Sequence, residues 1–181
     1  MDTGLGDLAL KNMDLRRLIR DVPDFPQAGI VFKDITPLLA DPLALAAAID
    51  ALATAAMGQG VTKVVGIESR GFILAPPVAL RLGVGFVPVR KPDKLPWKAR
   101  RQSYQLEYGS DALEIHEDSL TRADRVLVVD DVLATGGTAA AAVTLVRSLG
   151  ATVVGTAFLI ALGFLGGAKR LDCPVHAVLN Y

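Results

Sequence analysis

The chain has 181 residues, 51% of them hydrophobic, which is enough for a single domain with a substantial core. Its 19 basic and 19 acidic residues give zero net charge, so non-specific binding to nucleic acid or to a membrane surface is not expected. The one cysteine, Cys173, excludes an internal disulfide, and the first residues lack the features of a signal peptide, so we expect a cytoplasmic protein. His116 and His176 have no spaced partners, which argues against zinc, and the apolar stretch 153–168 is too short to cross a bilayer.

The first third of the chain predicts short segments followed by a long helix. Apolar residues among basic ones predict a short amphipathic helix over 13–20, and residues 30–33 predict an extended segment after a stretch rich in proline and glycine. Asp41 and Pro42 are typical of an N-cap and a first helical position, and they predict a helix that reaches about Met57.

The rest of the chain alternates between apolar runs and helical patterns. Helices are predicted over 72–82 and 139–149, and Pro76 and Pro77 predict either a kink in the first of these or a late start. This alternation favours a mostly parallel α/β sheet with helices on both faces. Buried strands are predicted at 64–67, 84–89, 126–129, 152–160 and 175–179.

Acidic residues and glycines gather directly after the strand at 126–129. Asp130 and Asp131 follow its predicted end, and open α/β sheets bind ligands at the carboxyl ends of their strands. Residues 134–138 (Ala-Thr-Gly-Gly-Thr) then lead into a helix whose first N–H groups favour an anion. Such a turn alone is often only a turn, but the carboxylates beside it indicate a ligand with phosphate and polyol parts. P-loop and Rossmann patterns are absent.

A second candidate site follows the strand at 64–67. Arg70 comes after Glu68 and Ser69 and before a glycine, where its guanidinium group could hold phosphate oxygens in a bidentate manner. The alternative is a surface ion pair between Arg70 and Glu68, which would contribute little.

Residues 90–101 contain six basic residues and one acid, with prolines that oppose regular structure. The simplest interpretation is a solvated loop, and the alternative is a lid over a phosphate site. Residues 104–108 alternate in polarity like a strand, on which Glu107 would by spacing alone be an exposed acid. Residues 113–116 predict a further strand.

The segment V-V-D-D-V-L-A-T-G-G-T at 128–138 resembles the phosphoribosyl pyrophosphate motif of the type I phosphoribosyltransferases. Its exact residue sequence is similar to the motif of the adenine-specific branch of that family. Four more segments match in order: D-F-P-Q-A-G-I-V-F-K-D-I-T-P at 24–37, E-S-R-G-F at 68–72, R-K-P-D-K-L-P at 90–96 and S-Y-Q-L-E-Y-G at 103–109.

This resemblance implies a role for each motif. The loop at 134–138 would hold the 5′-phosphate, Asp130 and Asp131 the ribose hydroxyls, and the segment around Phe32 the base. Glu107 would handle the proton at the base. An unusual peptide bond would lie between Glu68 and Ser69. The implied catalytic residues are Glu107, Arg70, Lys91 and Tyr108, and the implied substrate-binding residues are Val31, Phe32, Lys33, Glu68, Ser69, Lys94, Asp130, Asp131, Ala134, Thr135, Gly136, Gly137, Thr138 and Leu162.

The resemblance also implies the reaction: adenine and phosphoribosyl pyrophosphate give AMP and pyrophosphate, with Mg²⁺ held mainly through the substrate, in a homodimer. A hood of about residues 1–37 would cover the base in a single domain spanning 1–181. Ala161 departs from the family, which commonly has an acid there. Two alternatives stay open: an enzyme for another base, and a regulator that binds nucleic acid, which would need a DNA-binding extension or basic face.

Overall fold

The computed structural model describes residues 13–105 and 110–181. The chain divides into two compact units, residues 1–50 and 51–181. Helix α3 (Pro42–Thr54) begins in the first unit and ends in the second. The predicted N-cap is confirmed, because the backbone N–H groups of Leu43 and Ala44 each donate to Asp41 Oδ1 at 2.9 Å. The helix is three residues shorter than predicted and gives way to turns that continue to residue 60.

The first unit contains a small antiparallel hairpin of β1 (Arg20–Pro23) and β2 (Val31–Asp34). The rings of Phe25 and Phe32 pack edge to face with their centroids 5.2 Å apart. A short helix, α2 (Thr36–Ala40), follows. The amphipathic helix predicted over 13–20 is wrong: only a 3₁₀ turn, η1 (Leu15–Leu18), forms, because the chain from Arg20 onward pairs with β2.

The second unit is built on a five-stranded sheet in the order β4-β3-β7-β8-β9, and every neighbouring pair is parallel. The mostly parallel sheet predicted from the sequence is therefore confirmed. The strands are β3 (Lys63–Ile67), β4 (Gly85–Val89), β7 (Arg125–Leu133), β8 (Thr152–Ala161) and β9 (Val175–Asn180).

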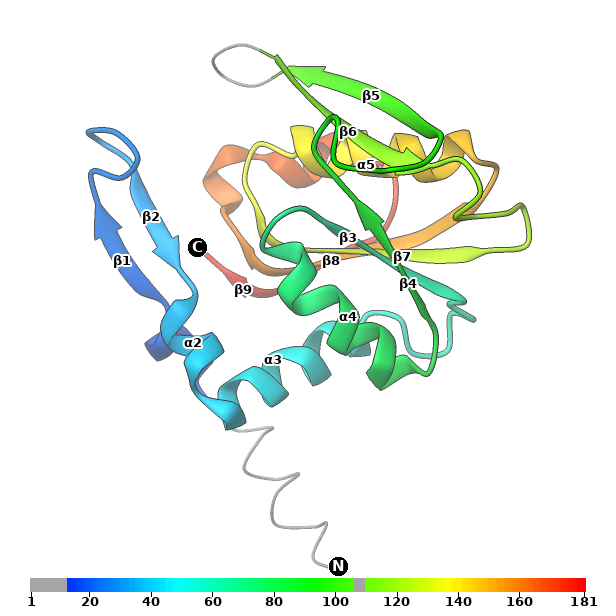
Figure 1. The fold of residues 1–181 in the computed structure, drawn as a ribbon. Coiled ribbons are helices and arrows are strands. Elements are labelled where there is room, and N and C mark those ends of the chain that lie inside the picture. The colour runs from blue at the N-terminus through cyan, green and yellow to red at the C-terminus, as the bar shows by residue number, and fades with distance from the viewer. Residues whose placement is uncertain (1–12, 106–109) are drawn as a thin grey trace, which may run out of the picture. The chain divides into compact units, whose positions relative to one another are not determined.

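The two long helices of this unit cover opposite faces of the sheet (Figure 1). Helix α4 (Gly71–Leu82) connects β3 to β4, and α5 (Gly137–Ser148) connects β7 to β8. These crossovers run in opposite directions along the sheet, so with the usual right-handed connection they place their helices on opposite faces. Helix α4 begins at Gly71 and continues through Pro76 and Pro77, so the alternative of a late start is wrong.

A second hairpin, β5 (Ala99–Gln105) with β6 (Ser110–His116), packs with α5. Buried side chains of β6, α5 and the sheet form one hydrophobic cluster, which includes Leu113, Leu145 and Val128. The loop predicted for 90–101 is partly wrong, because Arg100 and Arg101 belong to β5. The ladder with β6 provides backbone partners there, and the Arg100 guanidinium donates to the Ser148 carbonyl at 2.5 Å.

Candidate active site

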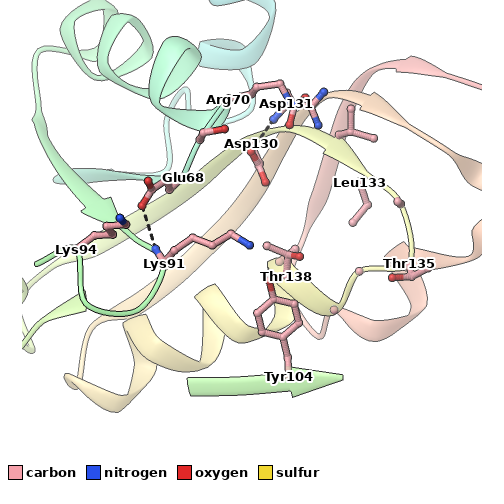
Figure 2. A pocket seen from close by; sticks show the side chains of 16 residues that line it. Glu68, Arg70, Lys91, Lys94, Tyr104, Asp130, Asp131, Leu133, Thr135 and Thr138 are labelled. Carbon is pink, nitrogen blue, oxygen red and sulfur yellow. Dashed lines mark hydrogen bonds and ion pairs between the residues drawn. The ribbon is translucent and has the colours of Figure 1, made fainter. Parts of the chain in front are cut away.

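A pocket of about 550 Å³ opens where β3 and β7 end. After β3 the chain continues to β4 on one side, and after β7 it continues to β8 on the other side. The point between two such strands is a topological switch point, where open α/β sheets have a crevice that binds ligands. Figure 2 shows the side chains around this pocket. The lining residues are Glu68, Ser69, Arg70, Lys91, Lys94, Tyr104, Asp130, Asp131, Val132, Leu133, Ala134, Thr135, Gly136, Gly137, Thr138 and Ala139.

Strand β7 continues past the acids that were predicted to end it. Its pairing with β3 stops at Val129, but its pairing with β8 continues to Leu133. Partners from β8 therefore keep the backbone of residues 130–133 extended, while the missing partner on the β3 side leaves the crevice open. Asp130 and Asp131 lie in a strand and not in a loop, and both line the pocket.

The turn before α5 has the backbone that its glycines predicted. Gly136 has φ +82° and precedes the first residue of the helix, and no side chain caps the helix there. The N–H groups at the start of α5 lie in the pocket lining, where they favour an anion. A Cβ on Gly136 would lie 2.4 Å from the Gly167 carbonyl oxygen, so this turn packs directly on the backbone of residue 167.

Arg70 pairs with Asp131 and not with Glu68, so the proposed surface pair is wrong. Arg70 Nε lies 2.9 Å from Asp131 Oδ2, and Figure 2 shows this contact at the end of β7. That carboxylate oxygen is buried and accepts no well-aligned hydrogen bond from the described residues. The other acid is held by the backbone, because the Asp131 N–H donates to Asp130 Oδ1 at 2.9 Å.

Burial raises the pKa of both acids. For Asp130 burial raises the pKa well above its ordinary value, and the neighbouring Asp131 charge raises it further. For Asp131 burial also raises the pKa, while the Arg70 guanidinium opposes the rise. Burial thus makes the charged form of both acids costly, and ligand hydroxyl groups or a cation would lower this cost.

Glu68 follows the end of β3 and forms hydrogen bonds with the segment after β4. Its carboxylate accepts from Arg90 Nε at 3.1 Å and from Arg90 Nη2 at 3.2 Å, and also from the Lys91 backbone N–H at 3.0 Å. The Arg90 bond lowers the pKa of Glu68. Arg90 also donates to the Lys94 carbonyl at 2.9 Å. The resemblance implied substrate binding for Glu68, which lines the pocket while its carboxylate bonds to Arg90 and to the Lys91 backbone. The peptide bond between Glu68 and Ser69 is cis, at the place where the resemblance implied an unusual peptide.

The predicted site lacked four residues that line the pocket, namely Tyr104, Val132, Leu133 and Ala139, and it lacked Asp111 behind the pocket. Tyr104 lines the pocket, and its hydroxyl donates to Asp111 Oδ2 at 3.3 Å. Asp111 also pairs with Lys91 Nζ. Tyr104 lies in a motif that the sequence analysis quoted, whereas Asp111 has no sequence signal. Only the register of the hairpin, which places residues 104 and 111 opposite each other, brings Asp111 here.

Of the predicted site residues in the second unit that the structure describes, all but Leu162 line the first pocket. Leu162 lines a separate pocket of about 460 Å³, which shares Leu133 with the first. Glu107 and Tyr108 lie outside the described residues. In the first unit, Val31, Phe32 and Lys33 lie on β2, and Lys33 Nζ pairs with Asp21 Oδ1 at 2.6 Å.

No group of three or more His, Cys, Asp or Glu side chains in the described parts of the chain is arranged to hold a metal ion. None of the helices within 13–105 and 110–181 has both the length and the apolar character needed to cross a membrane.

The crevice at the switch point of this parallel sheet is lined by the start of α5, by acids and by basic side chains, which is typical of α/β proteins that bind phosphorylated ligands. The family model for the phosphoribosyl transferase domain matches residues 35–173. The chain is thus a phosphoribosyltransferase by fold and by sequence.

Individual relatives narrow the class. The adenine phosphoribosyltransferase of Streptomyces coelicolor is 58% identical over 183 residues, covering 98% of this chain and 97% of the relative. The crystal structure of the enzyme from Rhodothermus marinus is 55% identical with a TM-score of 0.89, covering 97% of this chain and 99% of that one. The enzyme from Saccharomyces cerevisiae, solved with an imino-altritol bisphosphate and adenine, is 42% identical with a TM-score of 0.85, covering 89% and 94%. The chain belongs to the adenine phosphoribosyltransferase family.

Proposed function

We propose that the pocket at the ends of β3 and β7 binds phosphoribosyl pyrophosphate and that the chain transfers its phosphoribosyl group to adenine, giving AMP and pyrophosphate. The observation that carries this proposal is the shared pocket: an uncapped helix start, the adjacent acids Asp130 and Asp131, and three basic side chains line one cavity. One oxygen of Asp131 is buried and accepts no aligned hydrogen bond from the described residues. These groups match a phosphate, a pair of hydroxyls and a pyrophosphate in a single ligand.

The 5′-phosphate binds at the turn 134–138. Backbone N–H groups at the start of α5 provide donors and part of the helix dipole, and the hydroxyls of Thr135 and Thr138 add further donors. Gly136 has no side chain between the phosphate and this backbone. The same turn places Ala134 beside the ribose.

The ribose hydroxyls bind to Asp130 and Asp131. Asp131 Oδ2 is buried beside Arg70 and accepts no aligned hydrogen bond from described groups, so a hydroxyl donor from the ligand would satisfy it. Arg70, Lys91 and Lys94 hold the pyrophosphate, and Tyr108 assists them. Ser69 contributes through the backbone of its loop.

The base lies against β2 of the hood. Phe32 stacks on adenine, the backbone around Val31 and Lys33 reads its polar edge, and Leu162 is an apolar neighbour of the base. The edge-to-face packing of Phe25 on Phe32 supports this role, because it restrains the ring that would stack. Glu107 handles the proton at the base.

The reaction depends on positioning and on charge. As pyrophosphate leaves, C1 of the ribose gains oxocarbenium character, and N9 of adenine attacks from the opposite face. Arg70 and Lys91 stabilise the negative charge that develops on the leaving group, and the carboxylates of β7 lie near the cationic sugar.

Mg²⁺ fits this site as a companion of the substrate. Mg²⁺ is commonly bound through one or two carboxylates together with substrate phosphates. Asp130, Asp131 and Glu68 line the pocket, and Glu68 is already bonded to Arg90, so Asp130 and Asp131 are the carboxylates that would hold the ion. When bound, the ion would neutralise pyrophosphate charge. We further propose that the enzyme acts in the cytoplasm and forms a homodimer.

The decisive experiment is an assay of AMP and pyrophosphate formation from adenine and phosphoribosyl pyrophosphate, with and without Mg²⁺. We expect stoichiometric formation of both products and a strong dependence on Mg²⁺. Absence of AMP with Mg²⁺ present would contradict the proposed reaction. Sedimentation of the purified chain tests the dimer, which a purely monomeric species would exclude.

A further inference from the structure

Asp111 is an acid that lies behind the pocket and bonds to two of its lining residues. It is on β6, directly opposite Tyr104 in the hairpin register, and it does not itself line the pocket. Asp111 Oδ2 accepts from the Tyr104 hydroxyl at 3.3 Å and pairs with Lys91 Nζ, while Oδ1 accepts from the Ala112 N–H at 2.8 Å. Both oxygens are thus occupied by the protein.

Lys91 is anchored at both ends. Its backbone N–H donates to Glu68 at 3.0 Å, and its ammonium group pairs with Asp111. Figure 2 shows the side chain of Lys91 extended from the Glu68 side of the pocket toward Thr138 and Tyr104. A lysine side chain that is about half exposed would otherwise sample many rotamers, so these two anchors determine its direction.

The same network reaches the helix start that we assign to the 5′-phosphate. Tyr104 and Thr138 line the same pocket, and Thr138 lies in the first turn of α5. Burial raises the pKa of Tyr104, and the Thr138 hydroxyl opposes this rise. Lys91, Asp111 and Tyr104 therefore form one bonded cluster, and two of its members line the same pocket as the first turn of α5.

We propose that Asp111 is a positioning residue for phosphoribosyl pyrophosphate. It holds the Lys91 ammonium group in the pocket, on the side of the turn at 134–138, before the substrate binds. This inference rests on the proposed function, since it assumes that Lys91 binds the pyrophosphate. Holding a long side chain in place before binding reduces the entropy that is lost when the ligand arrives.

Simple electrostatics predicts the opposite effect for removal of Asp111. A carboxylate near a pyrophosphate repels it, so its loss should strengthen binding of the anion. The sign of the change in substrate affinity therefore separates a positioning role from a merely repulsive acid.

The test is a double-mutant cycle of Asp111→Asn and Lys91→Met, with the KM for phosphoribosyl pyrophosphate measured at saturating adenine and Mg²⁺. Asparagine keeps an acceptor for Ala112 and a partner for Tyr104 but loses the charge that orients Lys91. We expect Asp111→Asn to raise this KM about tenfold, the scale of the rotamer freedom of one lysine, with the KM for adenine unchanged. In the Lys91→Met background the same change should not raise the KM at all.

The matched control is Asp172→Asn, which breaks the exposed pair of Asp172 with Arg147 (2.7 Å) near the other end of α5 and should leave both KM values unchanged. An unchanged or lowered KM in Asp111→Asn, or an equal rise in the Lys91→Met background, would overturn the inference.

If Asp111→Asn does not fold, Tyr104→Phe removes only the hydroxyl that donates to Asp111 and should raise the KM for phosphoribosyl pyrophosphate about threefold. An unchanged KM in this variant would overturn the inference. A wild-type chain without activity would instead contradict the proposed function.

Discussion

Gly136 and Gly167 lie with their backbones in direct contact. A Cβ on Gly136 would lie 2.4 Å from the Gly167 carbonyl oxygen, and a Cβ on Gly167 would lie 2.1 Å from the Ala134 carbonyl oxygen. Neither distance is compatible with a methyl group. The turn at 134–138 and the 3₁₀ segment η3 (Gly167–Arg170) therefore hold each other in place, although Gly136 and Gly167 are 31 positions apart in the chain.

This contact predicts that Gly167→Ala damages phosphate binding from outside the pocket. The added methyl must displace the turn at 134–136, so we expect kcat/KM for phosphoribosyl pyrophosphate to fall by about 10²-fold and stability to fall by roughly 1–3 kcal/mol. Gly136→Val should remove turnover. Gly83→Ala is the control, because Gly83 has φ +69° but no atom near its added Cβ. If Gly167→Ala and Gly136→Val both had the wild-type KM for phosphoribosyl pyrophosphate, the turn at 134–138 would not be the 5′-phosphate site.

Asp130→Asn should inactivate the enzyme and stabilise the ligand-free protein. Burial raises the pKa of Asp130 in the folded protein above the unfolded value of 3.8. The contribution of Asp130 to the free energy of unfolding is therefore most favourable below pH 3.8, where the side chain is protonated in both states, and it is lost as the pH rises through the folded pKa. Asparagine does not titrate. At pH 7 we therefore expect a Tm higher by roughly 2–4 °C, with the difference vanishing below about pH 4. Activity should fall by about 10²-fold, since a hydroxyl loses its charged acceptor.

The measurement is calorimetric unfolding of both proteins between acid and neutral pH. The exposed Asp118→Asn variant is the control and should show no such pH-dependent gain. A lower Tm for Asp130→Asn at pH 7 would mean that the carboxylate is well solvated or well paired in the folded protein.

Glu107→Gln should slow the chemical step with little effect on phosphoribosyl pyrophosphate binding. Acid–base groups contribute typically ~10²–10⁴-fold, and we expect a fall in kcat of that size. Steady-state kinetics with both substrates checks this, with the exposed Glu117→Gln as a control. Activity within a few-fold of the wild type would identify Glu107 as the exposed strand acid that its spacing indicates.

Adenine should be preferred over hypoxanthine and guanine by a factor on the order of 10⁴. Ala134 lines the pocket and carries no acidic group, so the turn at 134–138 offers no acid to the base. A site that pairs with the adenine amino group meets a carbonyl oxygen in hypoxanthine, and the polar groups left unpaired are costly. Comparison of kcat/KM for the three bases tests this, and near-equal values for adenine and hypoxanthine would contradict it.

The sequence alone determined the parallel sheet and most of the pocket lining. Local patterns carry this information: the apolar runs of β3, β7 and β8 predict buried strands, and polar residues that follow such strands must meet at one edge of the sheet. Asp130, Asp131, Arg70 and the turn 134–138 could be predicted for this reason, since each depends on its position relative to a single strand.

Tertiary structure alone decided which groups neutralise one another. Two ion pairs depend on how β3, β4 and β7 lie side by side. They are the pair of Arg70 with Asp131 and the pair of Glu68 with Arg90. Asp111 reaches Lys91 only through the register of the β5–β6 hairpin, and Gly167 reaches the phosphate turn only after β8 is in place. These contacts join residues far apart in the chain, and no local periodicity reports a distance set by the packing of separate elements.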